Sequence, residues 1–281
     1  MLPSLIITFR EVLEVALIVG VVISYLARTN QTAFKKSVYF GLLAGIFISI
    51  LSAVLFEKLA GGFSGQSEEV FEGVMMLVGA SLLTTMIIWM RRQQSAVKKL
   101  EARVEAKIVK AEKFGLFFLM LVSVWREGVE LIIFLASASL VAGENNIIGA
   151  LLGMGLATTT GLALFVWSRH LPLKRFFNIT SILLILFAAG LVAHGVHEFH
   201  EAGLIPEGIK EVWNINPAVS DDGSFPLWHD KGALGSILKG LFGYNGNPSL
   251  VEVVSYLAYL SVAFWFFNKR PAPLSLHKST A

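Results

Sequence analysis

Two copies of one charged pattern interrupt the most apolar part of the sequence. Arg-Glu-x-x-Glu occurs at residues 10–14 and again at 126–130, each time inside a long apolar run. Residues three apart in a helix share one face, so the two glutamates of each copy can act together. Four carboxylates beside two arginines suit a hard cation such as Fe³⁺, although ligand type alone leaves Mn²⁺ and Ca²⁺ open. The pattern predicts a metal site with the ligands Glu11, Glu14, Glu127 and Glu130.

The composition excludes an ordinary soluble domain. Hydrophobic residues make up 55% of the 281 positions and charged residues only 15%, whereas soluble domains carry about 25% charged residues. An integral membrane protein accounts for this balance. The chain has no cysteine, which excludes disulfides, thiol catalysis and thiolate metal sites. Any metal must therefore use oxygen or imidazole ligands.

Seven segments are long and apolar enough to cross a bilayer, which takes about 20 helical residues. They lie near residues 2–27, 37–57, 69–90, 114–142, 147–168, 176–201 and 249–267. Lysine and arginine concentrate in segments 28–36, 91–113 and 169–175 and in the C-terminal tail. Basic loops stay in the cytoplasm, so the N-terminus is expected outside and the C-terminus inside. The net charge of +3 thus reflects topology and does not indicate a nucleic-acid partner.

The two charged motifs fall near the middle of the first and fourth segments. A central charge costs about 2.5–3.5 kcal/mol on insertion scales, so these helices must face a protein interior or a wet cavity. One alternative is that Arg10–Glu14 and Arg126–Glu130 are salt bridges that only tie helices together. That alternative leaves Glu11 unexplained, and likewise its counterpart in the second copy.

The doubled motif also predicts how the domain is organised. The first and fourth segments run in opposite directions, as expected for an inverted three-plus-three helix repeat with its site at the midplane. Two Gly-x-x-x-Gly patterns, at 41–45 and 149–153, support close helix packing in both halves. We therefore expect an all-α integral membrane protein of seven transmembrane helices. Its single domain, 1–281, would comprise repeat 1–92, a basic cytoplasmic helix 93–113, repeat 114–202, outer loop 203–248 with a short surface helix near 237–249, seventh helix 249–267 and cytoplasmic tail 268–281.

A second group of metal-ligand residue types is expected at the outer face. The third segment begins with three glutamates that form an acidic helical face. The sixth segment ends with two histidines and two glutamates at spacing i, i+3, i+4 and i+7, which share one helical face, and one further histidine lies beside them. The alternative is ordinary polar helix ends, where glutamate near an N-terminus is favoured by the helix dipole. The functional interpretation is a relay that passes metal to the midplane. Its candidate ligands are Glu68, Glu69, Glu72, His194, His197, Glu198, His200 and Glu201.

At the paired motifs the chain resembles the oxidase-dependent iron permease family of yeast and bacteria. The family pattern is Arg-Glu-Gly-Leu-Glu, twice; here the copies read Arg-Glu-Val-Leu-Glu and Arg-Glu-Gly-Val-Glu. The resemblance extends to Glu-Glu-x-x-Glu-Gly at 68–73, Phe-His-Glu-Ala-Gly-Leu at 199–204 and Gly-Leu-Phe-Gly-Tyr at 240–244. His194, His197 and Glu198 lie outside the bacterial form of this pattern.

The resemblance implies a permease that moves iron through Arg10, Glu11, Glu14, Arg126, Glu127 and Glu130, and no enzyme activity. It implies ferric iron as substrate, after external oxidation by a multicopper oxidase or by a cupredoxin-type protein and a haem peroxidase. No permanently bound cofactor is expected, and the bilayer would be the plasma membrane, the inner membrane of a bacterium. Two alternatives stay open: transport of another divalent metal such as lead or manganese, and a membrane-embedded di-iron ferroxidase. The latter normally uses paired Glu-x-x-His motifs, which the midplane segments lack.

Overall fold

The computed structural model describes residues 1–92, 104–105, 113–142, 147–166, 173–206, 208–220 and 224–268. All regular structure in these ranges is helical. The predicted basic helix 93–113 and the tail 268–281 lie almost wholly outside the described residues. The elements are α1 (Leu2–Arg28), a 3₁₀ turn (Thr32–Phe34), α2 (Lys35–Ala60), α3 (Gln66–Arg92), α5 (Lys113–Ala142), α6 (Ile147–Val166), α7 (Leu173–Glu201), α8 (Ala233–Phe242) and α9 (Leu250–Asn268).

The long helices match the apolar segments predicted from the sequence. Each of the seven predicted segments coincides with one helix of at least 19 residues, with ends that differ by a few residues. Four stretches meet the length and composition expected of a membrane span, namely 32–60, 66–88, 147–164 and 179–201. The other three long helices are not among these four stretches, because α1 and α5 carry the charged motifs and the apolar stretch of α9 is shorter. The prediction of an all-α protein with several membrane spans is confirmed.

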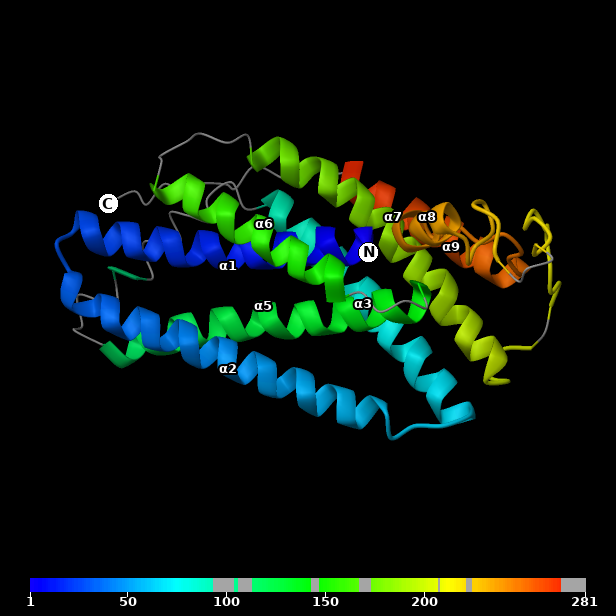
Figure 1. Ribbon diagram of the computed structural model, residues 1–281, viewed down its shortest axis with the longest axis horizontal. Coiled ribbons are helices and arrows are strands. Elements are labelled where there is room, and N and C mark those ends of the chain that lie inside the picture. The colour runs from blue at the N-terminus through cyan, green and yellow to red at the C-terminus, as the bar shows by residue number, and fades with distance from the viewer. Residues whose placement is uncertain are drawn as a thin grey trace, which may run out of the picture.

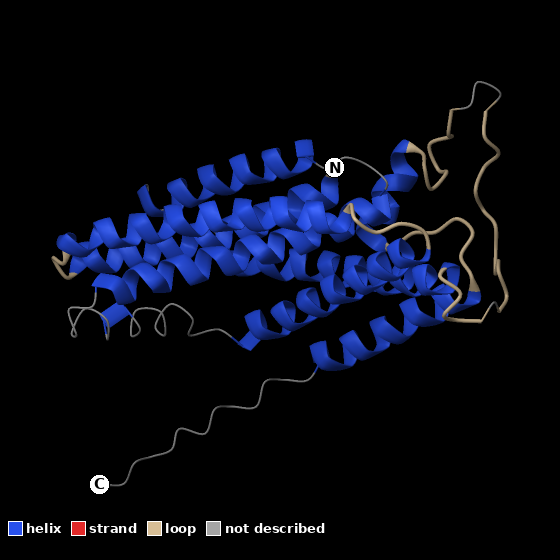
Figure 2. Cartoon of the chain, turned by 90° about the horizontal axis from the view of Figure 1, so that it is seen from below, coloured by secondary structure: helices blue, strands red, loops and turns tan. Residues whose placement is uncertain are grey.

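The helices form two adjacent groups (Figures 1 and 2). Helices α1, α2, α5 and α6 lie side by side in one group, while α3, α7, α8 and α9 form the other. The most extensive contacts pair α1 with α6, α2 with α5 and α3 with α7. Successive long helices run in opposite directions along the long axis (Figure 1). Both charged motifs therefore lie in the first group, because they are on α1 and α5.

Glycines allow the closest of these helix pairs to form. A methyl group at Gly41 of α2 would collide with α5, and one at Gly149 of α6 would collide with α1. The collisions would involve Phe117 and Met120 in the first pair, and Met1 and Ser4 in the second.

The second glycine of each Gly-x-x-x-Gly pattern makes the same contact one turn later. Gly45 abuts Leu121 and Val124 of α5, and Gly153 abuts Leu5 and Thr8 of α1. When the Arg-Glu-x-x-Glu motifs are superposed in sequence, Phe117 falls on Met1, Met120 on Ser4, Leu121 on Leu5 and Val124 on Thr8. Each motif helix is thus held by an equivalent glycine face from the other half of the chain.

The outside of the helix bundle is more apolar than parts of its interior. Phe47 of α2 is 68% exposed and Leu151 of α6 is 61% exposed, whereas Arg10 of α1 is 0% exposed. Apolar side chains facing outward are expected where lipid replaces water as the surrounding medium. Charged side chains are costly in lipid and face the interior of a bundle. This inversion is what a membrane protein with a polar internal site requires.

Candidate metal centre

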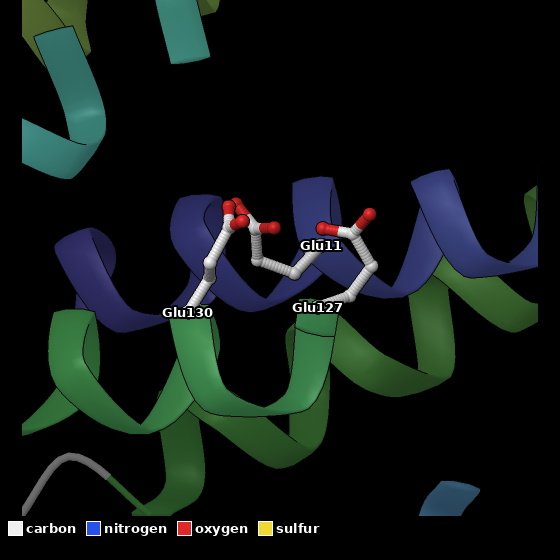
Figure 3. Close-up of side chains that lie close together, drawn as sticks. All are labelled: Glu11, Glu127 and Glu130. Atoms are coloured by element: carbon white, nitrogen blue, oxygen red, sulfur yellow. The ribbon is translucent and has the colours of Figure 1, made fainter. Parts of the chain in front are cut away.

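Three glutamates from the two motif helices meet inside the first helix group. Carboxylate oxygens of Glu11, Glu127 and Glu130 all lie within 4.8 Å of one another. Glu11 reaches from α1 toward the two side chains of α5 (Figure 3). Among the described residues, no other three histidine, aspartate or glutamate side chains bring ligand atoms so close. We call Glu11, Glu127 and Glu130 the carboxylate trio.

The arginines bind glutamates of their own helix. Arg10 Nε lies 3.3 Å from Glu14 Oε1, four residues on. Arg126 Nη2 donates to Glu127 Oε1 at 2.7 Å, and its Nε lies 3.2 Å from Glu130 Oε1. The salt bridges considered from the sequence are therefore present. They hold the carboxylates in place without occupying all of their oxygens.

Two oxygens of the carboxylate trio have no hydrogen-bond donor among the described residues. Glu11 Oε2 and Glu127 Oε2 are both inaccessible to solvent and make no hydrogen bond there. Their residues are 1% and 2% exposed. A buried carboxylate oxygen without a donor is strongly destabilising. A bound cation would remove that cost, and an all-oxygen ligand set suits a hard metal ion.

Glu14 lies beside the carboxylate trio and outside it. Its side chain is 13% exposed and bound to Arg10, and it interacts electrostatically with both Glu127 and Glu130. The structure therefore brings together three of the four predicted midplane ligands and keeps the fourth within electrostatic range. When all four carboxyl groups are ionised they outnumber the two guanidinium groups, and the site then carries negative charge that suits a cation.

The predicted outer cluster lies where the start of α3 meets the end of α7. A methyl group on Gly73 would collide with the carbonyl oxygen of Gly195, so these glycines let the two helices approach closely. Glu72 of α3 interacts electrostatically with Glu201 of α7, and with its own neighbours Glu68 and Glu69.

On α7 the acidic and imidazole groups of this cluster are interleaved. His197 Nε2 lies 3.2 Å from Glu201 Oε1, and Glu198 interacts electrostatically with Glu72, Glu201 and His197. His200 Nδ1 is buried without a hydrogen-bond partner among the described residues. The groups share one region but are less tightly drawn together than the carboxylate trio.

His194 lies one turn before His197 on α7, and its surroundings include helices α8 and α9. It is 7% exposed, and its Nδ1 lies 3.0 Å from the carbonyl oxygen of Gly190. The charged groups acting on it include Lys239 of α8 and Glu252 of α9. It therefore lies on the α8–α9 side of α7.

Lys239 and Glu252 are charged residues of this region that the sequence interpretation did not single out. Glu252 is 4% exposed and accepts hydrogen bonds from the Ser249 backbone N–H at 2.6 Å and from Asn245 Nδ2 at 3.0 Å. The Ser-x-x-Glu spacing at 249–252 is a capping-box signal that marks this glutamate. Lys239 has no such signal, because a lysine on a short amphipathic helix resembles a solvated surface residue.

Comparison with known proteins settles the family of the chain. The model of the iron permease FTR1 family matches residues 1–268. The chain belongs to the iron permease FTR1 family. A protein named ferrous iron permease EfeU from Yersinia pestis is 33% identical over 275 residues, covering 96% of this chain and 94% of its own length.

Other relatives cover the chain to the same extent. An EfeU permease of Escherichia coli O6:H1 is 33% identical over 273 residues, covering 96% of this chain and 95% of its own. An uncharacterized protein of Archaeoglobus fulgidus is 34% identical over 270 residues, covering 96% and 95%. No solved structure matches.

Membership of the FTR1 family confirms the resemblance drawn from the paired motifs. It identifies the chain as an iron permease, a multi-pass membrane protein with iron as its substrate. It also supports a transporter over an enzyme. The carboxylate trio is thus a candidate for the place where iron crosses.

Proposed function

We propose that this permease passes iron through the carboxylate trio, with Glu14, Arg10 and Arg126 as the supporting charges of the translocation site. The observation that carries the proposal is the pair of buried, donorless oxygens on Glu11 and Glu127. They come from two helices that are distant in sequence and both carry the motif. Motion of α1 relative to α5 would open the ligand set and release the ion.

The substrate we propose is ferric iron. The three carboxylate ligands support this choice, because hard oxygen donors bind a hard trivalent ion better than a softer metal ion. Oxidation of ferrous iron is assigned to a separate outer partner, either a multicopper oxidase or a cupredoxin-type protein with a haem peroxidase. The trio contains no histidine, which distinguishes it from the Glu-x-x-His sets of di-iron bundles.

The topology we propose has seven spans, an outer N-terminus and an inner C-terminus in the plasma membrane, the inner membrane of a bacterium. The alternating helix directions support it (Figure 1). The inverted three-plus-three repeat is supported by the equivalent glycine contacts of α2 with α5 and of α6 with α1. The basic loops fall on one side in this arrangement, as the positive-inside rule requires.

The outer cluster is proposed to collect iron before it reaches the trio. Its members are Glu68, Glu69, Glu72, His197, Glu198, His200 and Glu201. Concentrated negative charge raises the local cation concentration and thus the rate of capture. We call these seven residues the collecting cluster. His194 is also a predicted ligand, but we leave it outside the cluster because it is buried and its Nδ1 lies 3.0 Å from the carbonyl oxygen of Gly190.

The deciding experiment is radioiron flux into liposomes that contain the purified protein. Ferrous iron under anoxic conditions and citrate-chelated ferric iron would be compared in parallel. Glu11→Gln and Glu130→Gln should each abolish flux while protein insertion stays normal. Glu57→Gln is the matched control, because Glu57 is exposed at the outer end of α2.

Each outcome of the flux experiment has a defined meaning. Normal flux in both inserted trio variants would refute the translocation role of the trio. Flux of ferrous iron alone would refute the ferric substrate. In a separate aerobic sample, oxygen consumption with ferrous iron, without flux, would indicate a ferroxidase in place of a transporter.

A further inference from the structure

The imidazole ring of His197 lies between two carboxylates where the end of α7 meets the start of α9. Helices α7 and α9 pack against one another. Glu252 Oε2 of α9 lies 3.7 Å from His197 Nδ1. Glu201 Oε1, one turn further along α7, lies 3.2 Å from Nε2 of the same ring. Each ring nitrogen of His197 therefore faces a carboxylate oxygen.

The carboxylate of Glu252 is fixed in this place. Glu252 is 4% exposed. Its Oε2 accepts the Ser249 backbone N–H at 2.6 Å, and its Oε1 accepts Asn245 Nδ2 at 3.0 Å. The backbone N–H of Glu252 in turn donates to Ser249 Oγ at 3.3 Å, which completes a capping box at the start of α9. A carboxylate held through both oxygens can fix the orientation of the group that it faces.

The two ring nitrogens of His197 lie in different surroundings. Nδ1 is inaccessible to solvent and makes no hydrogen bond with the described residues. The side chain as a whole is 35% exposed, and that of Glu201 is 53% exposed. The buried nitrogen thus faces the fixed carboxylate of Glu252, while Nε2 faces the accessible carboxylate of Glu201.

This arrangement has the chemistry of a metal-binding histidine. A neutral imidazole carries one N–H and one lone pair. With the proton on Nδ1, toward Glu252, the lone pair on Nε2 faces a carboxylate oxygen, and the two repel each other unless a cation joins them. Two ligand atoms bound to one ion at about 2.1 Å and at angles of about 90–110° lie about 3.0–3.4 Å apart. The separation of 3.2 Å between His197 Nε2 and Glu201 Oε1 falls in that range.

The other two histidines of this part of α7 lack this arrangement. His194 Nδ1 lies 3.0 Å from the carbonyl oxygen of Gly190. His200 Nδ1 is buried without a hydrogen-bond partner in the part of the chain that the structure describes. Within that part, His197 alone of the three has a carboxylate within ion-pair distance of each ring nitrogen.

We propose that Glu252 is a positioning residue of the collecting cluster. It orients the His197 ring so that Nε2 and the Glu201 carboxylate form a nitrogen–oxygen ligand pair for ferrous iron. A carboxylate behind a metal-binding histidine fixes the ring and raises its basicity. Imidazole suits Fe²⁺, whereas Ca²⁺ uses oxygen ligands. The pair therefore selects ferrous iron over calcium at the outer face, an inference that rests on the proposed role of the collecting cluster.

The test is equilibrium binding of radioactive ferrous iron, without oxygen, and of radioactive calcium to the purified full chain. Every protein also carries Glu11→Gln, which disables the carboxylate trio, so that binding reports the outer face. His197→Ala and Glu252→Gln should each weaken ferrous-iron binding by about tenfold or more, and calcium binding much less. The double variant should bind ferrous iron as His197→Ala does, because a positioning residue has no effect without the ring that it positions.

Ser249→Ala is the matched control for the helix cap. It removes the hydroxyl that accepts the Glu252 N–H but retains the backbone N–H that holds the Glu252 carboxylate. Ferrous-iron binding should stay unchanged in this variant even if the melting temperature falls. An equal loss of binding in Ser249→Ala would reduce Glu252 to a helix cap.

The sign of the Glu252→Gln effect distinguishes positioning from a simple ion pair. An imidazolium that only ties α7 to α9 would be released when the charge of Glu252 is removed, and ferrous iron would then bind equally well or more tightly. Either result would overturn the proposal, as would additive losses in the double variant.

A Glu72→Gln variant separates this proposal from the one on which it rests. If Glu72→Gln weakens binding of both ions while the His197 and Glu252 variants bind as their parent does, only the positioning role is refuted. If Glu72→Gln also leaves both ions unaffected, the collecting cluster itself is refuted.

Discussion

Arg10 and Arg126 occupy the same position of the two motifs, yet Arg10 is completely buried and the Arg126 side chain is 50% exposed. Each contacts the glutamate four residues further on, at 3.3 Å and 3.2 Å respectively. The two halves of the translocation site are therefore alike in contacts and different in solvation. The difference predicts different consequences when each charge is removed.

Arg10→Met should destabilise the protein far more than Arg126→Met. Removing one partner of a buried ion pair costs about 3–5 kcal/mol, because the remaining charge stays buried. Loss of the half-exposed Arg126 side chain would open its partner Glu127 to the surroundings, whereas the position of Arg10 is completely enclosed. Thermal unfolding of the purified protein in detergent measures the difference. Equal shifts in melting temperature would contradict the inferred asymmetry.

Glu72→Gln should raise the iron concentration at half-maximal uptake and leave the maximal rate nearly unchanged. A collecting residue increases capture at limiting iron, but it takes no part in the later passage through the trio. Initial uptake rates over a range of iron concentrations separate the two parameters. A fall in the maximal rate with unchanged half-saturation would place Glu72 on the translocation path instead.

Gly153→Leu should disrupt the packing of α6 on α1, whereas Gly155→Leu should be tolerated. A side chain at Gly153 would meet Leu5 and Phe9 of α1, but nothing lies within 4 Å of a methyl group at Gly155. Overpacking typically costs about 1–3 kcal/mol, and more where only backbone can yield. Melting temperature and yield after membrane extraction report the loss. Comparable behaviour of the two variants would contradict the contact.

Single cysteines can test the topology directly, because the chain contains none of its own. Ser64→Cys and Ser224→Cys, in loops at the proposed outer end, should react with an impermeant maleimide in intact cells. Thr32→Cys, in the turn between α1 and α2, should react only after the membrane is opened. All three positions are exposed, so a protected Ser64→Cys would reverse the proposed orientation.

The sequence predicted the long helices well, because each is a run of apolar residues that only a helix accommodates in lipid. It also predicted that Glu11, Glu127 and Glu130 would converge, since charged side chains in apolar helices are stable only where they face partners inside the bundle. It did not predict that Glu14 would stay outside the trio, because that depends on the rotation of α1 against α5. The short helix near 237–249 was expected, and α8 is found at Ala233–Phe242.

Lys239 shows what sequence patterns could not supply. On α8 it appears as an ordinary surface lysine, and the packing of this helix on α1 and α7, through Gly240 beside Pro3 and Gly243 beside Gly190, is not visible in the sequence. Those contacts join segments that are far apart in the chain. The same is true of His194, whose neighbours come from α8 and α9.

The pairing of α1 with helices of the other half has a consequence for biosynthesis. Helix α1 leaves the ribosome first, carrying Arg10, Glu11 and Glu14, and each charge costs about 2.5–3.5 kcal/mol in a lone helix in lipid. Its partners α5 and α6 begin at Lys113 and Ile147. At about 5–20 residues per second of translation, α1 waits on the order of ten seconds for them. During that interval the translocon or an insertase must shelter the charges of α1 from lipid. Depletion of such a factor should therefore lower the level of this permease more than that of membrane proteins whose first helix is uncharged.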